Sequence, residues 1–203
     1  QAPSVHKPAS VITRWRGHEA PRYPTGLKLS PVHASAASRW RRVSLYEPSR
    51  TTESVLILGD SLSAAPHFLR CFAHTEERWG SDEGVRATLQ QLGAGWGEGS
   101  ALSRESLAAI PGAPSWQVLK EDDEGRAPLD RELDENPGRF AFVLFGTNDL
   151  NYHKGEERFL RSMWTLGSRL FTRGVVPIFS TLPHRLTSYE DQLKVLNFNS
   201  IVR

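Results

Sequence analysis

The sequence predicts an α/β fold with a parallel sheet, preceded by a basic extension. Two apolar runs carry this prediction: residues 55–58 end in Gly-Asp-Ser at 59–61, and residues 140–145 end in Gly-Thr-Asn-Asp at 146–149. After position 51, segments that suit strands, loops and helices alternate, which is the pattern of a sheet covered by helices. The 203 residues are 38% apolar and 24% charged, a composition typical of a globular protein rather than a disordered one.

The extension comprises residues 1–50, and the α/β domain comprises residues 51–203. The extension holds nine Lys and Arg against two acids, a net +7 that leaves −5 for the rest of a chain whose total is +2. Its six prolines predict a segment that wraps around the domain or extends from it rather than forming long helices. Two interpretations stay open: the segment binds an acidic polymer or membrane surface, or it packs on the domain with its arginines in water.

The first half of the domain is predicted from short signals. Residues 55–58 form the first strand, and residues 65–78 suit a helix after the Gly-Asp-Ser turn. The periodicity of residues 85–92 fits a strand or a helix equally well. A glycine-rich turn at 93–99 leads into a helix predicted over residues 100–110.

The second half is predicted from longer patterns. The polar insertion at 121–138 suggests a solvated loop or short helix, with a lid over the site as the alternative. Residues 156–173 predict a helix with one apolar stripe, formed by Phe159, Met163, Leu166 and Leu170. Residues 175–180 predict a further strand, and residues 188–203 a final helix that buries Leu193, Leu196 and Ile201.

The two strand ends bring chemistry to one edge of the sheet. The carboxyl ends of parallel strands are where open α/β sheets bind their ligands. Ser61 follows the first strand and Asn148 follows the strand at 140–145. A serine hydroxyl and an amide N–H at one edge indicate acyl transfer, with Ser61 attacking a carbonyl and Asn148 stabilising the oxyanion.

Gly-Asp-Ser-Leu at 59–62 followed by Gly-Thr-Asn-Asp at 146–149 resembles the GDSL, or SGNH, hydrolases. The resemblance covers about residues 54–203 and implies a flavodoxin-like three-layer α/β/α sandwich with esterase or lipase activity. It also implies that residues 85–92 are a strand and that a glycine after this strand completes the oxyanion hole. Gly97 is the first choice for this oxyanion-hole glycine, and Gly99 is the second.

The chain departs from this family in its general base. The family's Asp-x-x-His does not occur in the sequence, and a serine without a base is a poor nucleophile at neutral pH. His184 and His153 are outside candidates for the base. We expect a base from a C-terminal continuation or separate piece of the same protein, so the chain alone should be nearly inactive.

No cofactor is expected. The 93–99 turn has Glu98 where a dinucleotide fingerprint needs glycine. His67, Cys71 and His74 have a spacing that could bind a metal, but the same spacing is typical of a buried helical stripe, so no metal site is assigned. The two aspartates of the motifs, Asp60 and Asp149, are interpreted as braces of their turns rather than as proton carriers.

The remaining expectations concern partners and location. No apolar run approaches the roughly 20 residues needed to span a bilayer, and no nucleic acid is expected as a partner. The start at Gln1 suits a processed chain, which favours a secreted or extracytoplasmic protein. The predicted function is ester hydrolysis through an acyl-enzyme on Ser61, with a small-molecule or carbohydrate ester as substrate. The alternatives are a non-catalytic domain that binds an ester or glycan, and an O-acyltransferase.

Overall fold

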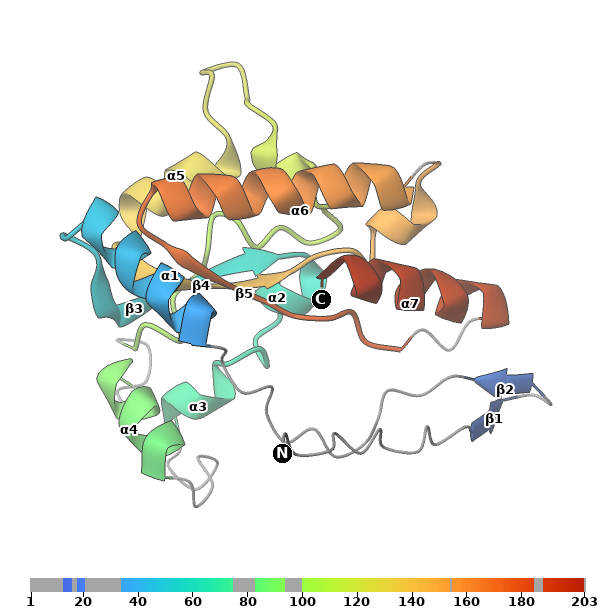
Figure 1. Cartoon of the computed structure of the whole chain (residues 1–203), viewed down its shortest axis with the longest axis horizontal. Coiled ribbons are helices and arrows are strands. Elements are labelled where there is room, and N and C mark those ends of the chain that lie inside the picture. The colour runs from blue at the N-terminus through green and yellow to red at the C-terminus, as the bar shows by residue number, and fades with distance from the viewer. Residues whose placement is uncertain are drawn as a thin grey trace, which may run out of the picture.

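A computed structural model describes residues 13–15, 18–20, 34–74, 83–93, 100–153, 155–184 and 188–202. Its centre is a parallel sheet of three strands in the order β3-β4-β5, namely Thr51–Gly59, Gly138–Leu144 and Val176–Phe179. The three strands predicted from apolar runs are therefore confirmed, and they run parallel (Figure 1). A separate antiparallel pair, β1 (Thr13–Trp15) and β2 (His18–Ala20), lies in the extension.

Successive side chains of a strand point to opposite faces of the sheet, and in this sheet both sets include apolar residues. Leu56, Leu58 and Val143 belong to the larger core cluster. This cluster also includes side chains from three helices, α5 (Pro128–Glu135), α6 (Gly155–Thr172) and α7 (Tyr189–Val202). Val55 belongs to a second cluster with residues of α3 (Cys71–His74) and α4 (Glu83–Gln91), and Phe140 and Phe142 pack against it. Helices therefore contribute to apolar clusters on both faces. None of the described helices is both long and apolar enough to cross a membrane.

The helices of the second half match the sequence patterns. Helix α6 (Gly155–Thr172) buries the predicted stripe of Phe159, Met163, Leu166 and Leu170. Helix α7 (Tyr189–Val202) lies where the final helix was expected, but it buries Val195 and Phe198 while Leu193 is 40% exposed. In the polar insertion, α5 (Pro128–Glu135) is a short helix, and it lies beside α6 above the sheet in Figure 1.

The strand expected at residues 85–92 is wrong. Residues 85–91 lie in α4 (Glu83–Gln91), of which only Leu89 is buried, and residue 92 lies in the turn that follows. The Thr88 hydroxyl donates to the Gly84 carbonyl one turn earlier. On the free side of β3, the place of a further strand is taken by a single parallel bridge between Gly59 and Ala109. Gly59 N–H donates to the Ala108 carbonyl at 3.0 Å, and Ile110 N–H donates to the Gly59 carbonyl at 2.9 Å.

The helix expected at residues 100–110 is also wrong, because serine hydroxyls there bond to the backbone and compete with helix formation. Ser100 Oγ donates to the Leu92 carbonyl at 3.2 Å, and Ser106 Oγ donates to the Ile57 carbonyl at 2.5 Å. Residues 100–110 form turns and the bridge instead.

The helix expected at 65–78 is interrupted by Pro66. Ala65 has an extended backbone, φ −64° and ψ 140°, as a residue before proline prefers. The short helix α2 (Ser61–Ala64) ends just before Ala65, turns follow at 66–70, and a second short helix, α3, spans Cys71–His74. Positions 75–78 lie outside the described residues.

The end of the extension packs on the domain. Residues Ala34–Tyr46 form α1, a 13-residue helix, so the expectation that the extension avoids long helices is wrong there. Val43 is buried at 6% exposure. The Arg50 guanidinium donates to the carbonyls of Arg173, Asn136, Gly138 and Leu133 at 2.5 to 3.1 Å. Arg50 thus ties the start of β3 to α5, β4 and the end of α6.

Candidate functional site

The turn after β3 presents Ser61 at the first position of α2. Asp60 is the N-cap of this helix, and its Oδ1 accepts a hydrogen bond from Leu62 N–H at 3.0 Å. The sequence-based interpretation of Asp60 as a brace of its own turn is therefore confirmed. Ser61 is exposed, and its hydroxyl makes no hydrogen bond to any other described residue. The side chain is thus open to a substrate.

Gly59 is required for this turn by close packing. A Cβ at Gly59 would lie 2.0 Å from Ser63 Oγ and 2.5 Å from the Leu144 carbonyl oxygen. Side-chain atoms do not approach that closely, so any other residue would displace α2 from the end of β3. The glycine of the Gly-Asp-Ser motif therefore fixes how closely the serine helix sits against the sheet.

The turn after β4 brings Asn148 to Asp60. Asn148 Nδ2 donates to Asp60 Oδ2 at 3.2 Å and to the Ala113 carbonyl at 3.3 Å. Asn148 begins a short 3-10 helix, η4 (Asp149–Asn151), as its N-cap residue. The two motifs, 88 residues apart at Asp60 and Asn148, thus meet at one edge of the sheet, as the sequence predicts.

A third turn, at residues 111–115, joins the first two. Asp149 is 1% exposed, and its carboxylate accepts from Ser115 N–H at 2.9 Å and from Ser115 Oγ at 2.6 Å. Asp149 therefore braces the third turn against the Asn148 turn. Gly112 in this turn has φ +78° and is exposed, and its N–H makes no hydrogen bond within the described part of the chain.

The sequence analysis did not single out Gly112, the glycine of this third turn. Gly97, the first choice for the oxyanion glycine, and Gly99, the second, both lie outside the described residues. The signal for Gly112 was present as the Pro-Gly pair at 111–112, which is typical of a tight turn. It went unused because residues 100–110 were assigned to a helix rather than to the segment that runs beside β3.

Two buried carboxyl groups give the site its electrostatic character. Burial raises the pKa of Asp60 above 3.8, and hydrogen bonds from Leu62 N–H and the Thr147 side chain act against this rise. Burial also raises the pKa of Asp149, with the Asp60 charge adding to the rise and the two Ser115 donors opposing it. The neutral form of each carboxyl is therefore favoured more than in water.

The histidines do not complete a catalytic triad in the described residues. His184 follows β5 and is exposed, and Gln192 Nε2 lies 2.8 Å from its Nδ1. This contact involves Nδ1 of the ring, and no described residue, His184 included, is hydrogen-bonded to the Ser61 hydroxyl. His153 is exposed beyond η4, and no hydrogen bond joins it to Ser61.

His67, Cys71 and His74, whose spacing was weighed against a metal site in the sequence, do not lie on one helix. His67 lies in the turns after Pro66, while Cys71 and His74 lie in α3. Among the described residues, no group of three or more His, Cys, Asp or Glu could hold a metal ion.

A cavity of about 270 Å³ lies between α2 and the segment 104–111. Its walls include Ala64, Pro111, Arg70 and Arg104, so apolar and charged groups are mixed. The space begins beside the helix that carries Ser61 and ends at residues near Gly112.

Comparison with known proteins gives no relative: the chain matches no protein-family model, no curated protein and no solved structure.

Proposed function

We propose that the protein is a serine-dependent carboxylic ester hydrolase of the GDSL, or SGNH, type. The observation that carries the proposal is the hydrogen bond from Asn148 Nδ2 to Asp60 Oδ2, which brings the amide of one motif to the serine turn of the other. The apolar clusters on both faces of the sheet support the three-layer sandwich that such enzymes have.

In the proposed reaction, Ser61 Oγ attacks the carbonyl carbon of the ester and its proton passes to a base. The carbonyl oxygen becomes an oxyanion, which needs hydrogen-bond donors placed in advance. Gly112 N–H and Asn148 Nδ2 are our choice for these donors. The long contact from Asn148 to the Ala113 carbonyl, 3.3 Å, is the one that a charged oxygen would replace. Asp60 keeps the amide oriented meanwhile.

Collapse of the tetrahedral intermediate releases the alcohol and leaves the acyl group on Ser61, and water then cleaves the acyl-enzyme. No described histidine is hydrogen-bonded to Ser61, so the base of this scheme is assigned to no residue.

The test is hydrolysis of p-nitrophenyl acetate by the complete protein, together with labelling by a serine-directed fluorophosphonate. Ser61→Ala should abolish both, because the nucleophile is lost. Ser180→Ala is the matched control: this serine is also exposed and also follows a strand of the sheet, and it should leave both unchanged. Asn148→Ala should lower kcat about a hundredfold with little change in KM. Turnover in Ser61→Ala equal to that of the parent would refute the proposal.

A second function is favoured by one observation. Ser61 lacks a histidine partner in the described residues, and both hydrogens of Asn148 Nδ2 point at protein acceptors. A domain that binds an ester or glycan without cleaving it would have this arrangement. It would show ligand binding with neither turnover nor labelling of Ser61.

A further inference from the structure

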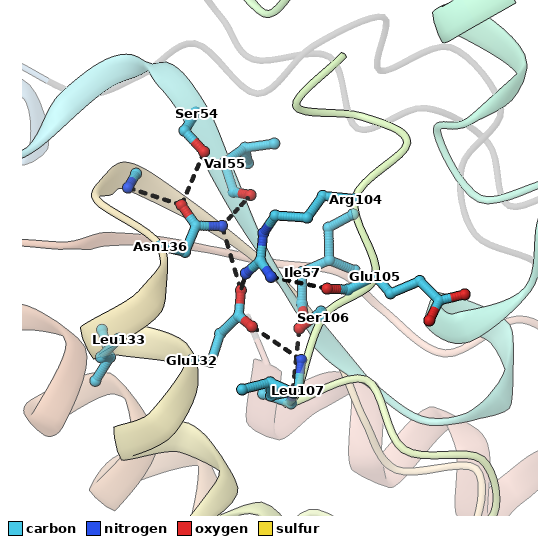
Figure 2. Close-up of polar contacts among 12 residues, drawn as sticks. Ser54, Val55, Ile57, Arg104, Glu105, Ser106, Leu107, Glu132, Leu133 and Asn136 are labelled. Atoms are coloured by element: carbon cyan, nitrogen blue, oxygen red, sulfur yellow. Dashed lines mark hydrogen bonds and ion pairs between the residues drawn. The ribbon is translucent and has the colours of Figure 1, made fainter. Parts of the chain in front are cut away.

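Glu132 in α5 has a carboxylate that is fully buried, at 0% exposure. Figure 2 shows this carboxylate between two parts of the chain. It pairs with the Arg104 guanidinium, and it accepts from Leu107 N–H at 2.9 Å and from Asn136 Nδ2 at 3.2 Å. Burying a charge costs desolvation free energy, and replacing a buried ion pair by apolar side chains is often neutral or stabilising. The arrangement therefore calls for a reason other than stability.

The Glu132 contacts hold a segment that has little backbone pairing of its own. Residues 104–110 run beside β3, yet they join it through the single bridge between Gly59 and Ala109. A full strand would be positioned by a ladder of hydrogen bonds. Here the position of the segment depends on side chains: Glu132 holds Arg104 and Leu107, and the Ser106 hydroxyl holds the Ile57 carbonyl at 2.5 Å.

The other end of the network is fixed to the sheet. Asn136 Nδ2 donates to the Val55 carbonyl at 3.0 Å. Asn136 Oδ1 accepts from Ser54 Oγ at 2.8 Å and from Gly138 N–H at 2.9 Å. Glu132 and Asn136 are one helical turn apart and in contact (Figure 2). Through these two residues, α5 connects the segment by hydrogen bonds to β3 and β4.

The position of this segment decides where Gly112 lies. Ile110 N–H bonds to the Gly59 carbonyl, two residues before Ser61, and Gly112 follows two residues after Ile110. A shift of the segment along β3 would move the Gly112 amide relative to the Ser61 hydroxyl. Oxyanion donors act only when they lie within hydrogen-bond distance of the developing charge.

We propose that Glu132 is a positioning residue of the esterase site: through Arg104 and Leu107 it fixes the 104–112 segment, and thereby the Gly112 N–H, relative to Ser61. This inference rests on the proposed function. It differs from a purely structural role because it predicts a loss of kcat beyond the loss of stability.

The experiment compares Glu132→Gln with Asp130→Asn in the same protein. Glu132→Gln replaces one acceptor oxygen by an NH2 group that cannot accept from Arg104 or Leu107. Asp130→Asn makes the same carboxylate-to-amide change in the same helix, where Asp130 pairs with Arg169 of α6 rather than with the segment. Glu132→Gln should lower kcat for p-nitrophenyl acetate by about ten- to a hundredfold, with KM changed less than about threefold. Asp130→Asn should leave kcat unchanged.

Hydrogen exchange of the Ile110 amide, which donates to the Gly59 carbonyl, is the second readout. Exchange at Ile110 should accelerate in Glu132→Gln and stay as in the parent in Asp130→Asn, because only the first variant releases the segment. Arg104→Lys is the milder variant if Glu132→Gln fails to fold, since Arg104 is 34% exposed. It should reproduce both effects in part.

The outcomes separate the two proposals. Equal kcat in Glu132→Gln and the parent, with unchanged Ile110 exchange, would overturn the positioning role of Glu132. If Ser61→Ala keeps full turnover, the proposed function fails, and hydrogen exchange alone then tests whether Glu132 fixes the 104–112 segment. Faster exchange at Ile110 in Glu132→Gln would support that role, and unchanged exchange would contradict it.

Discussion

At the scale of single residues, the chain offers two glycines with nearly the same backbone and different surroundings. Gly112 has φ +78° and Gly125 has φ +73°, and a Cβ at either would meet no atom within 4 Å. Gly112 lies in the turn between the Ser61 and Asn148 turns, whereas Gly125 lies in the exposed loop before α5. The pair therefore separates backbone strain from a role in the site.

Gly112→Ala and Gly125→Ala should each lower the free energy of unfolding by about 1–2 kcal/mol, because a left-handed φ strains any residue with a Cβ. Only Gly112→Ala should also lower kcat, since relaxation of its backbone moves the proposed oxyanion donor. Urea unfolding and steady-state ester hydrolysis measure the two effects. Gly97→Ala completes the set: a loss of kcat there, and none at Gly112, would return the oxyanion role to the glycine chosen from the sequence.

The raised pKa of Asp60 predicts a pH dependence of stability. Below about pH 3.8 the carboxyl is protonated in both the folded and unfolded states. As the pH rises, the Asp60 carboxyl ionises in the unfolded state before it ionises in the folded state. The free energy of unfolding therefore falls until the pH has passed the raised pKa of the folded state. Above the folded pKa the loss is complete and constant. Burial of Asp60 thus lowers stability at neutral pH relative to acid.

Asp60→Asn isolates this contribution. Its carbonyl can still accept from Leu62 N–H, but its NH2 cannot accept from Asn148. The unfolding free energy of Asp60→Asn minus that of the parent should rise as the pH increases from about 3.8 through the raised pKa of Asp60. Urea titrations at each pH measure the difference, and a difference independent of pH would contradict the raised pKa. The variant should also lower kcat, because Asn148 loses its orienting acceptor.

At the scale of elements, the sequence patterns correctly predicted the strands and helices that a clear apolar run or a long helical repeat marks. The strands β3, β4 and β5 each contain an apolar run, and α6 repeats apolar residues on one face over 18 residues. These elements bury the side chains that the patterns marked, and the ends of β3 and β4 bring Ser61 and Asn148 to one edge. That much of the fold and of the site was predictable.

The elements that failed are short or rich in competing polar groups. Residues 85–92 fit two periods equally, and the choice made from the resemblance was wrong because a different segment, 107–110, runs beside β3. Serine hydroxyls removed the helix at 100–110, and with it the context that would have marked Gly112. Glu132 could not be predicted as buried, since its partners Arg104 and Leu107 come from a segment 25 or more residues away.

At the scale of the whole molecule, the strand order has a consequence for how the chain folds. Residues 145–175, which include α6, join β4 to β5, whereas β3 must cross residues 60–137 to reach β4. Closing the longer connection costs more chain entropy before any pairing is gained. The β4–α6–β5 unit should therefore be structured in the folding transition state, and β3 should dock after it.

Leu166 of α6 and Leu56 of β3 test this order, because both are fully buried and belong to the same core cluster. Truncation of either to alanine should cost about 2–5 kcal/mol. Leu166→Ala should mainly slow folding, and Leu56→Ala should mainly speed unfolding, as stopped-flow rates over a range of urea concentrations would show. The reverse pattern would mean that the long-range β3–β4 pairing forms first. If β3 docks last, the turn that carries Ser61 is the last part of the proposed site to form and the first to be lost when the protein unfolds.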